Sequence, residues 1–347
     1  MKKKMRSVIC VILSLMLLLT ACGGSKSEEK SKKDASKGDT PTIRVGVSWH
    51  EMQSVNVTVW GEYMKKFGEE KGPEYGVNFE WIEVVGDATP VQEASNIQDL
   101  INQQVDIMVV WCNNAETIGE SIQKAQDAGS KVVTLDHQDA GKIADAHVGQ
   151  DTLDQSIVAS EALADILEKD GVKDAKAIEL FGSLGDPNSV NRSEGWKQVE
   201  EERKLWTTVT TVPTEWKTEN FKSGLSNALA ANPDAEVLYI ASDFAFSAVQ
   251  SALEEAGRWK KRGEEGHMYI CTQDVLPQAY EAFVAGYIDS GVPFDNIAHA
   301  EKVVEVVADL YLGNPVEKEN WVKSPAVTAD NIETEASVWA RDYLDYE

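Results

Sequence analysis

The chain has few cysteines and few histidines, and their spacing excludes several kinds of chemistry. Its 347 residues include four cysteines, of which Cys112 and Cys271 lie far from each other and from the two near the N-terminus. This usage excludes a disulfide framework, and we expect Cys112 and Cys271 to be buried free thiols. The five histidines form no HExxH motif, and the sequence has no CxxC pair. We therefore expect neither a bound metal nor any other cofactor.

Basic residues are scarce relative to acidic ones. There are 33 Lys and Arg against 58 Asp and Glu, which gives a formal net charge of -25. Such an excess argues against nucleic acid as a partner, because the phosphate backbone would be repelled. It would also repel an anionic membrane surface, so a lipid chain would have to hold the protein there.

Long apolar runs are scarce too, and the run that matters, Val8 to Leu19, is too short to span a bilayer. It follows a basic segment at residues 2–6 and ends in Leu19-Thr20-Ala21-Cys22, a pattern typical of lipoprotein signals. We predict that residues 1–21 are a signal peptide and that Cys22 carries the lipid, which anchors the protein on the extracytoplasmic face of the cell membrane. The alternative is an ordinary secretory signal that happens to contain a cysteine.

Residues 22–41 are rich in Ser, Lys, Glu, Asp and Gly, which predicts a lipidated flexible linker. From Thr42 onward, short β-branched runs alternate with amphipathic stretches, as is typical of βα units around parallel sheets. The length of this part and its four units on each side of residue 150 predict two Rossmann-like α/β lobes. The expected strands are Ile43–Trp49, Phe79–Val85, Asp106–Trp111, Lys131–Asp136, Lys176–Gly182, Thr207–Val212, Glu236–Ala241 and Met268–Gln273, with helices at Thr152–Lys169 and Asn220–Ala231.

Polar and aromatic residues gather where these strands end, and ligands of open parallel sheets bind beyond the carboxyl ends of the strands. Carboxylates, amides, an arginine and indoles suit a polyhydroxylated neutral molecule. Other roles remain open, because a strand tryptophan commonly belongs to the core and an aspartate after a strand, such as Asp243, commonly caps a helix. The strand ends are Ser48-Trp49-His50, Trp111-Cys112-Asn113-Asn114, Asp136-His137-Gln138, Gly182 to Arg192, Ser242-Asp243 and Gln273-Asp274.

The most specific motif is Asp186-Pro187-Asn188-Ser189-Val190-Asn191-Arg192, followed by Glu194-Gly195-Trp196. With this motif, the chain from Thr42 almost to its end resembles the bacterial sugar-binding lipoproteins and periplasmic proteins of the ribose, galactose and xylose type, which feed ABC importers. The resemblance implies that Arg192 contacts the sugar and that Asp186 and Asn188 touch ligand, as in galactose-binding members.

Further matches imply further sugar contacts. Asp136 ends a strand as in the family, Trp216 matches the aromatic residue that stacks on the sugar, and Asp274 matches the hinge-side aspartate. At three positions this chain departs from the family pattern. His137 replaces the usual Arg or Lys, Ser242 replaces Asn, and Gln273 replaces a hydrophobic or aromatic residue. These side chains are polar but differ in reach, so the exact sugar stays open. The segment after the first strand lacks the usual Asn-Pro-Phe. The remaining contacts that we predict are Trp49, Gln53, Trp111 and Asn113.

The resemblance also implies a type I periplasmic binding protein fold with three chain crossings near residues 150, 291 and 321. The N-terminal lobe would comprise 42–149 plus 293–321, and the C-terminal lobe 150–292 plus 322–347. We expect a monomer that closes around a monosaccharide, preferably a pyranose pentose or hexose, and delivers it to an ABC transporter permease. Inositols and signalling sugar derivatives remain open, and no calcium loop is recognisable.

Three other functions are alternatives to this interpretation. The same receptor could report to a sensor kinase or chemoreceptor, and nothing in the sequence separates the two. A surface hydrolase could use Asp136 and Asp274 as a carboxylate pair, but no motif supports a nucleophile, so we expect no enzyme activity. A sugar-responsive transcription regulator would need a helix-turn-helix motif, where this chain has a signal and a linker.

Overall fold

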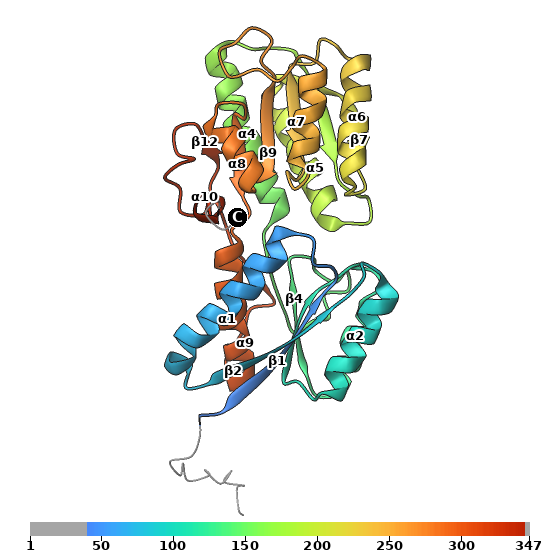
Figure 1. The fold of residues 1–347 in the computed structure, drawn as a ribbon, viewed down its shortest axis with the longest axis vertical. Helices are drawn as coiled ribbons and strands as arrows, with labels where there is room; N and C mark the ends of the chain where they lie inside the picture. Colours follow the sequence, from blue (N-terminus) through green and yellow to red (C-terminus); the bar gives the residue numbers. More distant parts are fainter. Residues whose placement is uncertain (1–39, 344–347) are drawn as a thin grey trace, which may run out of the picture. The chain divides into compact units, whose positions relative to one another are not determined.

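The computed structural model describes residues 40–343, and it contains two six-stranded sheets, each with helices on both faces (Figure 1). The predicted signal peptide, Cys22 and most of the predicted linker lie outside the described residues. Within residues 40–343, no helix has both the length and the apolar character of a membrane-spanning segment.

The first lobe is the sheet ordered β11-β5-β4-β3-β1-β2 with its four helices, and all its strand pairs are parallel. Alternate side chains of β3 enter two cores: Val109 packs with α1 and α9, and Val110 packs with α2 and α3. The ribbons of α1 and α9 lie on one side of the sheet and that of α2 on the other (Figure 1). The elements are β1 (Thr42–Trp49), α1 (Val55–Tyr75), β2 (Asn78–Val85), α2 (Pro90–Asn102), β3 (Ile107–Trp111), α3 (Gly119–Asp127), β4 (Lys131–Leu135), β5 (Ala146–Gly149), α9 (Asn296–Leu312) and β11 (Glu319–Trp321).

The second lobe is the sheet ordered β12-β10-β9-β8-β6-β7, parallel except at its β12 edge, with helices on both faces. One face packs against α4 and α5, and the other against α6, α7 and α8. The elements are α4 (Thr152–Asp170), β6 (Ala175–Phe181), α5 (Pro187–Arg203), β7 (Trp206–Pro213), α6 (Thr218–Ala231), β8 (Val237–Ile240), α7 (Phe246–Glu255), β9 (Tyr269–Asp274), α8 (Pro277–Val284), β10 (Ser290–Pro293), β12 (Val327–Thr328) and α10 (Ala340–Tyr343).

The predicted class of fold, two α/β lobes with parallel sheets, is confirmed. The eight expected strands correspond to β1 to β4 and β6 to β9, and the two expected helices correspond to α4 and α6. The short strands β5, β10, β11 and β12 were not predicted. The chain passes between the two sheets after β5, after β10 and after β11. The exact lobe boundaries stay a prediction, because sheet membership does not fix a boundary residue.

A glycine allows the helices α4 and α5 to pack closely. A Cβ atom at Gly195 would lie 2.8 Å from the carbonyl oxygen of Leu153 and 2.8 Å from Cβ of Ser156, closer than side chains normally approach. Residue 195 therefore has to be glycine for α5 to lie against α4 in this way. Arg192, one turn earlier on α5, is thereby held over the carboxyl end of the second sheet.

Candidate functional site

Arg192 lies at the centre of a buried polar cluster in the second lobe. Its side chain is on α5, and the residue is 4% exposed. Nη2 donates to Oδ1 of Asp274 at 2.7 Å and to Oε1 of Gln155 at 3.1 Å, and Nη1 donates to the carbonyl oxygen of Ala241 at 2.8 Å. Ser242 Oγ donates to the other carboxylate oxygen of Asp274. The structure therefore brings together three predicted site residues, Arg192, Ser242 and Asp274.

The charges of this cluster offset one another. Burial by itself lowers the pKa of Arg192, but Asp274, Tyr239, Asp136 and Asp186 together outweigh burial, so the pKa lies above its usual value and the guanidinium stays charged. Gln155, on α4, was not predicted as part of this cluster. The available signal is that Thr152, Gln155 and Ser156 place polar side chains on the same face of α4 as the apolar residues that follow.

Asp243 holds the turn that carries Asp274. Asp274 and Val275 have left-handed backbone with φ of 86° and 53°, which a non-glycine residue adopts only when its surroundings hold it there. Asp243 accepts hydrogen bonds from the backbone N–H groups of Val275 at 2.9 Å and Leu276 at 3.0 Å. The expected role of Asp243 as a cap of the next helix is therefore wrong, since its carboxylate fixes the turn before α8. Burial, and then the charge of Asp274, raise the pKa of Asp243 well above its ordinary range.

In the first lobe, Asp136 lies between an indole and an imidazole. Oδ2 of Asp136 accepts a hydrogen bond from Nε1 of Trp111 at 3.1 Å and lies 3.4 Å from Nε2 of His137. Burial raises the pKa of Asp136 despite the nearby His137. Burial alone would lower the pKa of His137, but the carboxylates of Asp136 and Asp186, together with the hydrogen bond to the Cys112 backbone, outweigh burial and raise that pKa. His137 therefore tends toward its charged form beside Asp136.

One hydrogen bond links the polar residues of the two lobes. Nδ2 of Asn188, near the start of α5, donates to Oδ1 of Asp136 at 3.0 Å. Both residues follow strand ends, β6 for Asn188 and β4 for Asp136. The carboxyl edges of the two sheets therefore meet at this pair, where the sequence predicted a ligand site.

Trp216 and Asp186 form a second pair of predicted residues. Nε1 of Trp216 donates to Oδ2 of Asp186 at 3.0 Å, while Oδ1 of Asp186 accepts from the backbone N–H of Asn188 at 2.9 Å and caps α5. A Cβ at Gly182 would lie 2.1 Å from the indole of Trp216, so only glycine permits the ring to lie there. The ring also packs edge-on against Phe244.

The other predicted residues have different surroundings. Trp49 is fully buried in the core of the first lobe, and its Nε1 donates to Glu83 at 3.0 Å. An indole with both faces covered and its N–H paired offers nothing to a ligand, so Trp49 is not part of the proposal below. Gln53 is exposed in the loop before α1, and Asn113 is half-buried after β3. Gln273 is fully buried, and its amide atoms have no partner among residues 40–343.

Glu93 is a buried carboxylate behind this site and was not among the predicted site residues. It is 2% exposed on α2 and accepts the backbone N–H of Asn113 at 2.7 Å. Burial raises its pKa to about 7, although that hydrogen bond acts in the opposite direction. Its spacing from Ile97 and Leu100, at i, i+4 and i+7, places it on the apolar face of α2 and could have revealed it.

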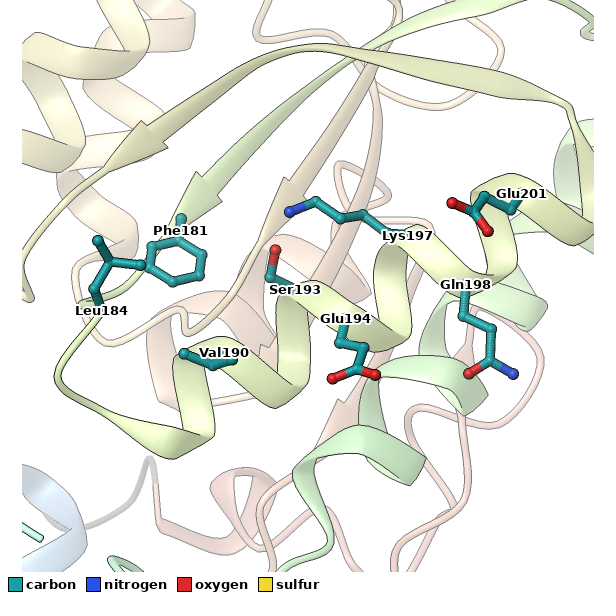
Figure 2. A pocket seen from close by; sticks show the side chains of 8 residues that line it. All are labelled: Phe181, Leu184, Val190, Ser193, Glu194, Lys197, Gln198 and Glu201. Carbon is teal, nitrogen blue, oxygen red and sulfur yellow. The ribbon is translucent and has the colours of Figure 1, made fainter.

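Two cavities lie outside this cluster. A cavity of about 530 Å³ runs along α5, with apolar side chains at one end and charged ones toward the other (Figure 2). A second, of about 300 Å³, lies between the starts of α2 and α3. Neither is lined by a predicted site residue. In the described part of the chain, no three His, Cys, Asp or Glu side chains are placed to hold a metal ion. The first cavity is lined by Phe181, Leu184, Val190, Ser193, Glu194, Lys197, Gln198 and Glu201.

Comparison with known sequences gives one consistent family. Residues 46–315 match the family described as periplasmic binding protein domain. The ribose import binding protein of Escherichia coli is 25% identical over 169 residues, which are 49% of this chain and 55% of that protein, so the match spans about half of that relative. The ribose import binding protein of Bacillus subtilis is 24% identical over 73% of this chain and 79% of its own length. The xylitol-binding protein of Mycolicibacterium smegmatis is 23% identical over 91% of this chain and 83% of its own length.

Solved structures with the same fold confirm the architecture. An ABC transporter solute-binding protein of Bacillus halodurans with bound myo-inositol has a TM-score of 0.71 at 21% identity, covering 85% of this chain and 98% of that one. The periplasmic ribose ABC transporter protein of Conexibacter woesei has a TM-score of 0.73 at 18% identity, covering 86% and 95%. The predicted type I periplasmic binding protein fold is confirmed.

Proposed function

The chain belongs to the periplasmic binding protein family, and on this premise we propose that it is an extracytoplasmic solute-binding lipoprotein. It captures a monosaccharide or a related polyol between its two lobes and delivers it to an ABC importer. The observation that carries the proposal is the hydrogen bond between Asp136 and Asn188, because it joins the polar ends of both sheets at one point.

The proposed ligand lies between two chemically different surfaces. The first lobe contributes the indole of Trp111, with the carboxylate and imidazole of Asp136 and His137 beside it. The second lobe contributes the Arg192 cluster and the indole of Trp216. Indole faces cover the C–H side of a sugar ring, while paired carboxylate and guanidinium groups select its hydroxyls. The proposed contacts are Gln53, Trp111, Asn113, Asp136, His137, Asp186, Asn188, Arg192, Trp216, Ser242, Gln273 and Asp274.

The names of the relatives support a neutral, polyhydroxylated ligand. Ribose, xylitol and myo-inositol appear in the names of proteins that share this fold. A ligand hydroxyl that replaces the bond between Asn188 and Asp136 would accept from the amide and donate to the carboxylate, so both groups stay paired. Because it contacts both lobes, the ligand stabilises the arrangement in which they lie together.

Binding is tested with the full-length protein in mild detergent, by calorimetric titration with D-ribose, D-xylose, D-glucose, D-galactose, xylitol and myo-inositol. We expect one or two of these to bind at micromolar concentration, which corresponds to about 8 kcal/mol. Asn188→Leu removes the group that links the lobes and should abolish binding, while Gln198→Leu, on the same helix but outside the site, should not. Failure of every ligand to bind would contradict the proposed class of ligand.

The proposed anchor is tested separately from binding. Cys22→Ser removes the thiol to which the lipid would be attached, so the variant should move from the membrane fraction to the soluble extracytoplasmic fraction. Ligand affinity should stay unchanged, since Cys22 is not among the proposed ligand contacts. A Cys22→Ser protein that remains in the membrane fraction would contradict the anchor and leave the binding proposal untouched.

A further inference from the structure

The aromatic residues around Asp136 differ in how their nitrogen atoms are paired. Nε1 of Trp111 donates to Asp136, and Nδ1 of His137 lies 2.9 Å from the carbonyl oxygen of Cys112. His50 packs against both rings, yet its Nδ1 and Nε2 are buried and have no hydrogen-bond partner among residues 40–343. A buried polar group without a partner is rare and calls for an explanation.

The position of His50 is fixed by its neighbours. It is the first residue after β1, at the same sheet edge as Trp111 and Asp136. Its ring centroid lies 3.8 Å from that of Trp111 and 5.9 Å from that of His137. Its carbonyl oxygen accepts the N–H of Ala88 at 2.8 Å, which ties this loop to the loop after β2. The imidazole is therefore held in place by packing and backbone contacts, without any hydrogen bond of its own.

The chemistry of the ring suits a hydroxyl group. Burial, and to a lesser degree the neighbouring His137, lower the pKa of His50 to about 3, so the imidazole is neutral at physiological pH. A neutral imidazole offers one N–H donor and one acceptor nitrogen. A hydroxyl is likewise a donor and an acceptor, so a vicinal diol can satisfy both nitrogens.

We propose that His50 is a specificity-determining ligand contact, whose imidazole hydrogen-bonds to hydroxyls of a neutral polyol that lies against Trp111. The inference rests on the proposed function and adds a residue to the proposed site. It also explains why the imidazole of His50 stays buried with both nitrogens unpaired within the described part of the chain, since such groups reject a ligand that lacks the matching hydroxyl.

The first test is the substitution His50→Phe, which keeps a flat ring against Trp111 and removes both nitrogens. Replacing an unpaired polar group by an apolar one of similar shape is neutral or stabilising, so the melting temperature without ligand should be equal to or above that of the wild type. Affinity for the best binder among the six sugars and polyols of the calorimetric titration should fall at least about tenfold, because a ligand hydroxyl loses its partner. His50→Gln, which keeps a donor and an acceptor, should retain part of the affinity.

The second test uses monodeoxy analogues of the best binder. The wild type should bind one analogue at least about tenfold more weakly than the parent, and this preference should disappear in His50→Phe. His267→Phe is the matched control, because that imidazole is paired on both nitrogens, with Asp289 and the carbonyl oxygen of Lys260. It should lower the melting temperature and leave affinity and analogue preference unchanged.

The outcomes separate this inference from the proposed function. If the wild type binds a ligand and His50→Phe binds it equally well with the same analogue preference, the inference is wrong and the proposed function stands. A His50→Phe protein that melts well below the wild type also contradicts it, because the nitrogens would then stabilise the fold. If the wild type binds none of D-ribose, D-xylose, D-glucose, D-galactose, xylitol and myo-inositol, both proposals fail together.

Discussion

The two halves of the proposed site satisfy their polar groups in different ways. In the second lobe, Arg192 and Asp274 are paired with each other and with further groups of the same lobe. In the first lobe, Asp136 is flanked by aromatic rings and bonds across to Asn188, while His50 has no partner among the described residues. Within residues 40–343, the second lobe therefore pairs the charges of Arg192 and Asp274 fully and leaves the neutral amide of Gln273 unpaired, while the first lobe leaves the imidazole of His50 unpaired.

This difference separates stability from selectivity. Removing one member of a fully paired buried network leaves the other member without a partner. Substitutions in the second lobe should therefore lower both the stability of the fold and the ligand affinity. The first lobe tolerates loss of a polar atom that has no protein partner, so changes there should alter binding more than stability. The following predictions test this contrast, beginning with the largest expected effect.

Arg192→Ala should have the largest effect on stability. It leaves the buried carboxylate of Asp274 without its cation, and breaking such a pair typically lowers the free energy of unfolding by about 3–5 kcal/mol. Urea denaturation measures the loss. The double variant Arg192→Met with Asp274→Leu removes both charges and should recover a large part of it. If the double variant is less stable than Arg192→Ala, the ion pair is not the source of the effect.

Glu93→Gln should change how the stability of the first lobe depends on pH. Burial raises the pKa of Glu93 from 4.5 to about 7, so the folded state binds a proton that the unfolded state releases between these values, and stability falls as pH rises through that window. A neutral Gln can still accept from Asn113 but does not titrate. At pH 8 the free energy of unfolding of the variant should therefore exceed that of the wild type by about 2–3 kcal/mol. At pH 5 the two proteins should be similarly stable.

The measurement is thermal unfolding between pH 5 and pH 8. His137, whose pKa is also raised, favours the folded state at low pH in both proteins, so the part of its contribution that does not depend on Glu93 cancels in the difference between the two curves. Glu116→Gln, at an exposed position, is the control and should follow the wild type at every pH. Parallel curves for the wild type and Glu93→Gln would show that the carboxyl group is already charged throughout this range.

The sequence predicted much of the fold because the buried strands have strong patterns. The apolar runs at Ile43–Trp49 and Lys131–Asp136 needed no tertiary information to be recognised as strands. The strands β5, β10, β11 and β12 contain four, four, three and two residues, too few to show a period of two. They form only because neighbouring strands offer hydrogen-bonding partners, and that information is not local.

The candidate site was predictable in position and less so in detail. The predicted strand ends placed Asp136, Arg192 and Asp274 correctly at the carboxyl edges of the sheets, because the topology of parallel sheets brings such residues to the same edge. The direction of each side chain does not follow from topology. Trp49 points into the core, and Asp243 bonds to a distant turn instead of its own helix. These outcomes depend on neighbours far away in the sequence.

Asp136→Asn tests whether a substitution in the first lobe affects binding more than stability. The amide keeps one acceptor oxygen but presents an NH₂ group to one of its two donors, Trp111 or Asn188. We expect a change in unfolding free energy of about 1 kcal/mol or less, with at least about a tenfold loss of affinity for the best-binding sugar or polyol. Chemical denaturation and calorimetric titration measure the two effects. Loss of stability as large as that of Arg192→Ala would remove the distinction between the lobes.

The smallest effect is expected from a second arginine on the same helix, Arg203. It forms ion pairs with three carboxylates of α4, namely Glu161, Asp165 and Glu168, whose side chains are 37%, 74% and 54% exposed. Solvent screens these pairs, so Arg203→Ala should lower the free energy of unfolding by less than about 1 kcal/mol, and by still less at 1 M salt. Ligand affinity should not change, because Arg203 lies at the far end of α5 from Asn188. Denaturation at low and high salt checks this. A loss comparable to that of Arg192→Ala would mean that the number of ion pairs, and not their burial, determines what an arginine contributes to this lobe.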